Sequence, residues 1–316
     1  MTGVEAQTST PIQTTFETAM RDHFGGLSGP VGLMVREIGG NGRTLTWNHE
    51  EMFPTASTLK VPLLYELYRQ AEAGTLDLTE RITLRHADRT PGSGVLQHLD
   101  DGLAPTLRDL AELMIIVSDN WATDIIFGQL GKDRIAATLR DLGLTATHLP
   151  LTIHELFSAS VGVDPTDPAI TYDALRQLLK DHEPGPDVAG LPVDTTNDVS
   201  TPADMVRLLT LIEQGHGISA DGRAQMIEML KHQNFTAIIP HRLPPDEKIE
   251  AAHKTGSLRG VKNDVGLVFS PKVTYAIAFM SREQDDIPEV VDRMARASRW
   301  VWDTLSPGND AYSGSH

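Results

Sequence analysis

Residues 53–64, FPTASTLKVPLL, place a serine and a lysine three positions apart at the start of an apolar run. The run predicts a helix, and residues three apart lie on the same helix face, so the lysine amine would lie beside the serine hydroxyl. A serine hydroxyl is a weak nucleophile near neutral pH unless a base accepts its proton. A lysine becomes such a base when burial or nearby cations lower its pKa. Ser57 and Lys60 are therefore candidate catalytic residues, although the pair alone also fits a helix-capping serine and a solvated lysine.

Composition narrows the classes of function. The 316 residues have room for one large domain or two modest ones with a substantial core. A net charge of −16 argues against nucleic acid or an anionic membrane as the main partner, and an acidic surface that aids solubility is a sufficient explanation for it. The chain has no cysteine and no His-Glu-x-x-His motif, so we expect no metal and no cofactor. The polar residues 1–13 do not resemble a secretory signal, which favours a cytoplasmic protein, or a secreted one whose signal has been removed.

Periodicity predicts strands near both ends of the chain and helices between them. Pro62 conflicts with the second of these helices, so we expect its first turns to be distorted, or capped so that the missing donor is harmless. Residues 148–201 are rich in proline and predict a long structured loop. The expected helices cover residues 11–26, 57–73, 107–117, parts of 121–141, 171–181, 202–214, 221–231 and 288–304, and the expected strands cover 31–37, 43–47, 264–269 and 273–280.

This order of elements predicts an α/β (α+β) fold in which an antiparallel sheet flanked by helices is interrupted by an inserted all-helical domain. The sheet domain would take residues 1–55 and 206–316. The helical domain would take residues 56–205, with the long loop at 148–201. A cleft between the two domains is the expected place for a site.

Two further short motifs fall where such a cleft would need them. SDN at residues 118–120 follows an apolar helical run and gathers a hydroxyl, a carboxylate and an amide. HKTGS at residues 253–257 precedes the C-terminal strands. Its lysine and threonine offer a cation and a hydroxyl to a substrate carboxylate, and its glycine allows close approach of a ligand. GSG at residues 92–94 predicts a flexible loop at the border of the cleft.

With STLK at 57–60, SDN at 118–120 and KTG at 254–256, in this order, the chain resembles class A β-lactamases and penicillin-binding proteins over about residues 16–304. The resemblance implies a β-lactamase/transpeptidase-like fold and a serine hydrolase without a cofactor. It also implies roles for single residues. Ser57 would be the acylated nucleophile, Lys60 would accept its proton, and Ser118 would relay a proton to the leaving nitrogen.

The resemblance further implies a substrate-binding set. An amide side chain of the substrate would bond to the second motif, and the substrate carboxylate would bond to the third. The backbone N–H groups of Ser57 and Ser257 would form an oxyanion hole. Asp119 is expected to brace its loop rather than touch substrate. The substrate-binding candidates are Asn120, Lys254, Thr255, Gly256, Ser257 and, after the motif, Arg259.

One part of the class A pattern is missing. Class A enzymes carry a glutamate, and four residues later an asparagine, in the loop between the second and third motifs. That glutamate activates the water that hydrolyses the acyl-enzyme. The best register here puts Ile153 and Phe157 at these two positions. Glu155 would serve as the base only if the loop were shifted by two residues, and His154 or Lys60 are alternatives. Without a positioned base we expect weak or altered hydrolysis.

The leading hypothesis is hydrolysis of a β-lactam or related cyclic amide through an acyl-Ser57 intermediate. Two alternatives use the same nucleophile. One is an esterase or D-amino-acid peptidase, and the other is a β-lactam-binding sensor module that is acylated without turnover.

Overall fold

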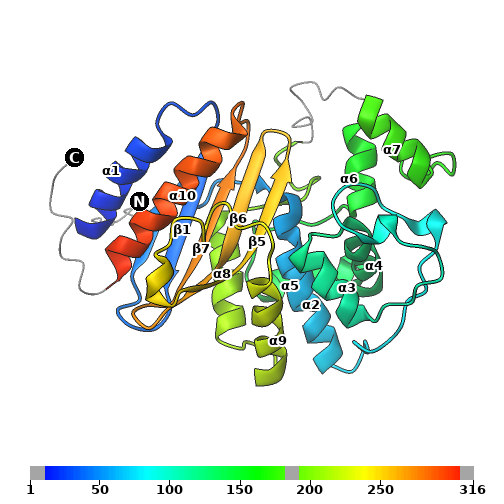
Figure 1. Cartoon of the computed structure of the whole chain (residues 1–316), viewed down its shortest axis with the longest axis horizontal. Coiled ribbons are helices and arrows are strands. Elements are labelled where there is room, and N and C mark those ends of the chain that lie inside the picture. Colours follow the sequence, from blue (N-terminus) through cyan, green and yellow to red (C-terminus); the bar gives the residue numbers. More distant parts are fainter. Residues whose placement is uncertain (1–10, 182–191, 307–316) are drawn as a thin grey trace, which may run out of the picture.

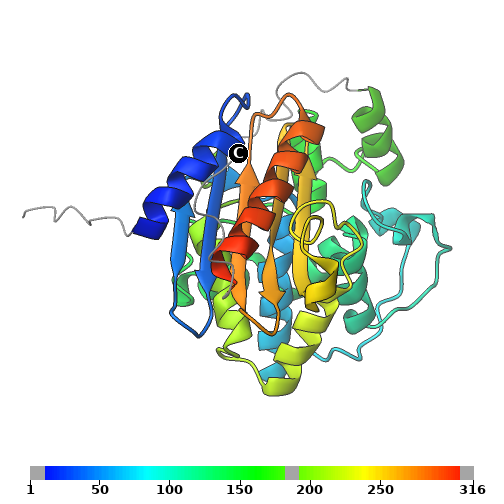
Figure 2. The ribbon, with the colours of Figure 1, turned by 60° about the vertical axis from the view of Figure 1, so that its left-hand side comes forward.

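The computed structural model describes residues 11–181 and 192–306. Its centre is a five-stranded antiparallel sheet in the order β2-β1-β7-β6-β5 (Figures 1 and 2). Strands near the N-terminus therefore lie in the same sheet as strands near the C-terminus, with β1 paired to β7 along its whole length. The strands are β1 (Val31–Glu37), β2 (Thr44–Trp47), β5 (Glu250–Leu258), β6 (Val261–Phe269) and β7 (Tyr275–Ser281).

Helices cover both faces of this sheet. Helices α1 (Pro11–Phe24) and α10 (Ile287–Leu305) lie side by side on one face, and α8 (Pro202–Glu213) packs on the other (Figures 1 and 2). Successive side chains of a strand point to opposite faces, so β7 contributes to two cores. Toward α1 and α10 it contributes Tyr275, Ile277 and Phe279, and toward the other helices Ala276, Ala278 and Met280.

The remaining helices form a second body beside the edge strand β5 (Figure 1). Helix α2 (Lys60–Glu72) runs through its middle, and ten of its 13 residues are buried. A helix that is buried on nearly every side needs neighbours all round. These neighbours include α3 (Leu107–Ile116), α4 (Asn120–Leu130), α5 (Lys132–Asp141) and α9 (Ala220–Lys231), while α6 (Ile153–Ser160) and α7 (Tyr172–Asp181) lie further out.

The two bodies are joined by a short antiparallel pair, β3 (Phe53–Pro54) with β4 (Val199–Ser200). This pair brings the residues just before Ser57 against the end of the 148–201 segment. The predicted domain boundary at 205/206 falls inside α8, which packs against β1 and β7. Part of the predicted long loop, residues 182–191, lies outside the described residues, as do residues 307–316.

The predicted fold class is confirmed, with local differences. Residues 56–59 form a 3₁₀ turn, and α2 begins only at Lys60. Pro62 is thus the third residue of α2, where a helix N–H has no partner inside the helix in any case, so its missing donor is harmless, as expected. The predicted helical stretch 121–141 is two helices, because Gly131 at φ 80° ends the first. Helix α6 and strand β5 are additional elements that the sequence patterns did not predict.

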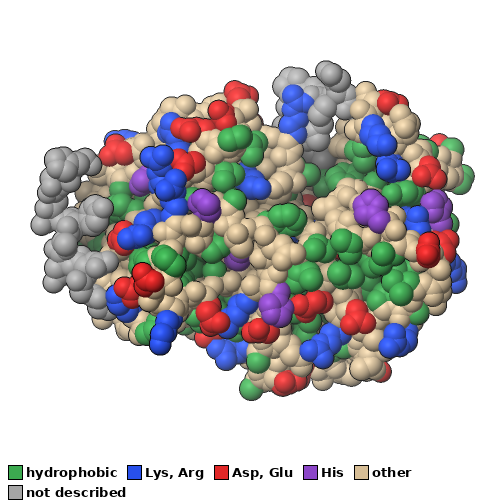
Figure 3. Space-filling view, viewed as in Figure 1, with side chains coloured by type: hydrophobic (Ala, Val, Ile, Leu, Met, Phe, Trp, Pro, Cys, Tyr) green, Lys and Arg blue, Asp and Glu red, His purple; other side chains and the backbone are tan. Residues whose placement is uncertain are grey.

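The surface agrees with the composition. Acidic and basic side chains are interspersed on the face seen in Figure 3, without a block of one sign. Within residues 11–181 and 192–306, no helix combines the length and apolar character needed to cross a membrane.

Candidate active site

Ser57 lies in the 3₁₀ turn at the junction of the two bodies, where this turn packs against β5. Its side chain is half-buried. The preceding residue, Ala56, has a φ of 45°, a left-handed conformation that costs roughly 1–2 kcal/mol for a non-glycine residue. Gly256 makes the close approach possible. A Cβ atom on it would lie 2.8 Å from the Thr55 carbonyl oxygen and 3.1 Å from the Ser57 nitrogen.

Lys60 is buried three residues after Ser57 and points to the second motif. Its Nζ donates to the carbonyl oxygen of Ser118 at 2.8 Å, to Ser118 Oγ at 2.9 Å and to Asn120 Oδ1 at 2.9 Å. Among the described residues, Nζ has no hydrogen bond to the Ser57 hydroxyl. Burial lowers the pKa of Lys60 to about 7, although the carboxylates of Asp119 and Asp124 act in the opposite direction. A large share of Lys60 is therefore neutral near pH 7 and able to accept a proton.

Lys254 is a second buried lysine, on the neighbouring strand β5. Its Nζ donates to the Thr255 carbonyl oxygen at 2.8 Å. Burial lowers the pKa of Lys254 well below its usual value, and the nearby Lys60 cation lowers it further. A bound anion beside Lys254 would favour its charged form again.

The second motif is held in place from several sides. Ser118 has a φ of 55°. Like Ala56, it is therefore a non-glycine residue of this site with a left-handed backbone conformation. Asp119 caps α4 by accepting from the Ala122 N–H, and its other oxygen accepts from two backbone N–H groups of the 92–96 loop. Asp119 therefore braces this loop, as expected. Asn120 uses one of the two N–H donors of Nδ2 to bond the Pro91 carbonyl oxygen at 3.0 Å, which fixes the orientation of its amide.

The 92–94 loop packs tightly over the second motif. Gly94 has a φ of 108°, and a Cβ atom on it would lie 2.3 Å from the carboxyl carbon of Asp119. Between the glycines, Ser93 donates through Oγ to the Ser118 carbonyl oxygen at 2.7 Å. Ser93 also lines the same pocket as Ser57. The sequence predicted only that this loop borders the cleft, and the flanking glycines were the signal that it must approach closely.

The remaining candidates lie along β5 and its turn. Thr255 is buried, and Ser257 is exposed with its Oγ accepting from Lys262 Nζ at 2.8 Å. Arg259 is exposed in the turn that follows β5. Lys262 was not predicted as a site residue, because a lysine on β6 has no local signal of proximity to the motif.

The pocket beside Ser57 has a volume of about 200 Å³. One side carries the polar groups of Ser57, Ser93 and Asn120, and another is apolar. The apolar side chains come mainly from α6 and are Ile153, Leu156, Phe157 and, from β5, Leu258.

Comparison with known proteins places this site in a family. A model of the Beta-lactamase2 family, described as the β-lactamase enzyme family, matches residues 15–305. The chain belongs to the β-lactamase enzyme family. Among solved structures, a β-lactamase from Sphaerobacter thermophilus is 29% identical, with a TM-score of 0.76 over 92% of this chain and 97% of that one.

Two other structures share the fold at lower identity. PBP-A is 24% identical, with a TM-score of 0.74 over 92% of this chain and 96% of that one. The extended-spectrum β-lactamase TLA-1 is 18% identical, with a TM-score of 0.75 over 93% of this chain and 99% of that one.

For this β-lactamase family member, the segment before α6 bears on how an acyl group would be removed. Ile153 and Phe157 line the Ser57 pocket, whereas Glu155 is not among the lining residues. Glu155 lies at the third position of α6, where it forms a capping box with Thr152, and both its oxygens accept from Lys132 Nζ, at 2.8 and 2.6 Å. Burial acts to raise the pKa of Glu155, but the bonds from Lys132 and the Thr152 N–H outweigh it and lower the pKa. These contacts argue against the predicted role of Glu155 as a base.

A different carboxylate, Asp124, anchors the start of α6. It accepts from the N–H groups of Ile153 at 2.7 Å and His154 at 2.9 Å, and from Thr90 Oγ1 at 2.8 Å. Burial raises the pKa of Asp124 to about 6, although these hydrogen bonds oppose the shift. Both carboxylate oxygens of Asp124 already accept hydrogen bonds. In this β-lactamase family member, Asp124 therefore holds the start of α6 and positions the apolar wall of the Ser57 pocket. Within the described ranges, no three His, Asp or Glu side chains gather into a group suited to a metal ion.

Proposed function

We propose that this protein is a serine hydrolase that acts on a β-lactam or related cyclic amide through an acyl-Ser57 intermediate. The observation that carries the proposal is the buried Lys60, with a pKa of about 7 and with Nζ 2.9 Å from Ser118 Oγ, three residues after Ser57. A buried lysine of this kind has the basicity that general-base catalysis requires near neutral pH.

The first half-reaction uses the three motifs together. The Ser57 oxygen attacks the amide carbon, and its proton passes to neutral Lys60, either directly or through Ser118. The carbon–nitrogen bond then breaks, the nitrogen takes a proton from Ser118 Oγ, and Ser118 regains one from the Lys60 ammonium. An ester on Ser57 remains. The N–H groups of Ser57 and Ser257 would stabilise the oxyanion, which the close approach of Gly256 to the 3₁₀ turn supports.

Binding of a substrate carboxylate falls to the third motif in this proposal. Lys254 supplies a buried cation, and Thr255 and Ser257 supply hydroxyls. Lys262, which holds the Ser257 hydroxyl at 2.8 Å, adds a second cation beside it. Asn120 would donate the second N–H of its Nδ2 to the amide side chain of the substrate, while the first stays on the Pro91 carbonyl oxygen.

A second candidate is a protein that is acylated at Ser57 but turns over slowly. The wall formed by Ile153, Leu156 and Phe157 favours it, because these side chains offer no base to a water molecule that attacks the ester. A positioned general base contributes on the order of 10² to 10⁴ in rate, so its absence would lengthen the life of the acyl-enzyme by a comparable factor.

One experiment separates these functions. The protein and its Ser57→Ala variant are mixed with a chromogenic cephalosporin, and the released colour is followed from the first seconds to hours. Steady turnover that requires Ser57 supports the hydrolase. A burst of about one equivalent followed by a slow phase supports the slowly deacylated protein. Cleavage of p-nitrophenyl esters without any reaction with the cephalosporin would favour an esterase, and full activity of Ser57→Ala would refute the nucleophile.

A further inference from the structure

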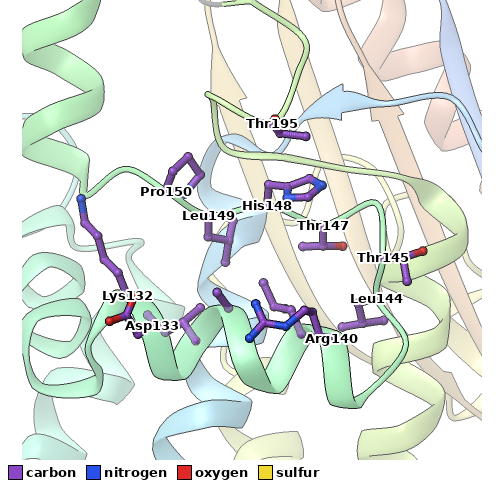
Figure 4. A pocket seen from close by; sticks show the side chains of 13 residues that line it. Lys132, Asp133, Arg140, Leu144, Thr145, Thr147, His148, Leu149, Pro150 and Thr195 are labelled. Atoms are coloured by element: carbon purple, nitrogen blue, oxygen red, sulfur yellow. The ribbon is translucent and has the colours of Figure 1, made fainter.

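A separate groove lies behind the segment that leads into α6 (Figure 4). Helix α5 forms one wall and residues 144–150 form the other, with Thr195 at the edge. Its volume is about 330 Å³, compared with about 200 Å³ for the Ser57 pocket. The two cavities share no lining residue, so nothing assigned to the catalytic site accounts for this groove.

The floor of the groove is apolar and its rim is basic. The buried side chains of Ile135, Leu139, Leu144 and Leu149 contribute the floor. The basic residues of the lining are Lys132, Arg140 and His148, and the acidic one is Asp133. With histidine counted as neutral, as it is in the net charge of −16, the lining holds two cations and one anion, and one of the cations, Lys132, is already paired with Glu155.

Arg140 is the basic residue best placed to receive a ligand. It is exposed, and no side-chain partner holds its guanidinium among the described residues. Figure 4 shows Arg140 on the helix side of the groove, facing Leu149 and His148, while Lys132 stands at the other end. A guanidinium binds a carboxylate through two parallel hydrogen bonds, and a pocket of this size with an apolar lining suits a small organic body.

We propose that this groove binds a small apolar monocarboxylate, with its carboxylate at Arg140 and its apolar body on the floor formed by Ile135, Leu139, Leu144 and Leu149. A phosphate ester matches less well, because the apolar floor formed by Ile135, Leu139, Leu144 and Leu149 would give a compact dianion no hydrogen bonds.

Although the two cavities are separate, a chain of side-chain contacts links the groove to the wall of the Ser57 pocket. Lys132 lines the groove and pairs with Glu155 at 2.6 Å. Glu155 caps α6, and Ile153, Leu156 and Phe157 of the same helix line the Ser57 pocket. A ligand with its carboxylate at Arg140, at the other end of the groove from Lys132, would leave the Lys132–Glu155 pair in place and reach α6 only through small shifts of the groove wall. The resulting change in the acylation or deacylation rate should therefore not exceed roughly fivefold.

The test is a titration by isothermal calorimetry with 3-phenylpropionate as the probe and the neutral 3-phenylpropanamide as its matched control. We expect saturable binding of one acid per chain and binding of the amide that is weaker by roughly tenfold, since a charge-assisted contact is lost. Arg140→Gln should weaken binding of the acid by a similar factor. Arg134→Gln, on the same helix but bonded to Gln70 and outside the groove, should leave binding unchanged.

Binding does not depend on the chemistry at Ser57, so the acid should bind Ser57→Ala as tightly as the native protein. This arm separates a failure of the groove proposal from a failure of the proposed function. Absence of saturable binding, equal affinity for acid and amide, or unchanged affinity in Arg140→Gln would overturn the groove proposal. Loss of binding in Ser57→Ala would also overturn it, because the probe would then occupy the catalytic pocket. Thermal melting of each variant establishes that it is folded.

Discussion

The apolar wall of the Ser57 pocket leads to a specific prediction for Ile153. The change Ile153→Glu puts a carboxylate at the first residue of α6, in a side chain that lines the pocket and is 4% exposed. The helix N-terminus favours a negative charge there. A carboxylate positioned on the attacking water should accelerate deacylation by about 10² to 10⁴, the usual contribution of a general base.

The same geometry predicts how much stability the Ile153→Glu variant loses and how its deacylation rate depends on pH. Burial of an isoleucine side chain is worth about 1.5–3 kcal/mol, so the variant should be less stable by a comparable amount. The nearby Asp124, which bonds the Ile153 N–H and has a pKa of about 6, would raise the pKa of the introduced glutamate further, as burial also does. Because only the ionised form acts as a base, the gain should grow as the pH rises.

The assay is the lifetime of the acyl-enzyme, followed by intact-protein mass spectrometry after excess β-lactam is removed. Ile153→Gln is the matched control, since it has a similar size and polarity but cannot accept a proton. The reasoning is wrong if a folded Ile153→Glu protein loses its acyl group no faster than Ile153→Gln at pH 7.5.

Three further predictions concern the groups around the site. The rate of acylation should rise with pH through about 7 and level off above it, because Lys60 must lose its proton to act as a base; a stopped-flow pH profile flat between pH 6 and 8 would contradict this. Gly94→Ala should lower the free energy of unfolding by about 1–3 kcal/mol through contact with Asp119, measured by urea unfolding, and should slow acylation, measured by adduct formation. The control is Gly102→Ala, also at positive φ but in open space. It should lower the free energy of unfolding by only about 1 kcal/mol and leave the acylation rate unchanged. Asp198→Asn should stabilise the protein at pH 7. Burial raises the pKa of Asp198 well above its unfolded value, so its ionised form opposes folding increasingly as pH rises from about 4; a melting temperature below that of the native protein at pH 7 would contradict this.

The motifs were enough to propose a site, because each carries its own chemistry within a few residues. The structure brings Lys60 to the second motif, with Nζ bonded to Ser118 and Asn120, whereas a spacing of three had suggested a direct pair of Lys60 with Ser57. The order of strands at both ends and helices between them was enough to predict the sheet with its inserted helices.

Other features depend on packing between distant segments. The buried strand β5 contains Lys254 and Thr255, polar residues that hide the strand pattern until the cleft around them is known. Helix α6 is eight residues long, too short for its periodicity to be distinctive. Ser93 bonds the carbonyl oxygen of Ser118, which is 25 residues later in the sequence. Glu155 accepts a hydrogen bond from Lys132, which is 23 residues earlier. Such pairings have no local signal.

The most direct measurement of the central claim is the location of the acyl group. The protein is incubated with penicillin G, digested at acidic pH to preserve the ester, and mapped by tandem mass spectrometry alongside Ser57→Ala and Ser93→Ala. The proposed mechanism predicts an adduct of the full penicillin mass on Ser57, present in Ser93→Ala and lost in Ser57→Ala. An adduct on another residue, or an adduct that persists in Ser57→Ala, would contradict it.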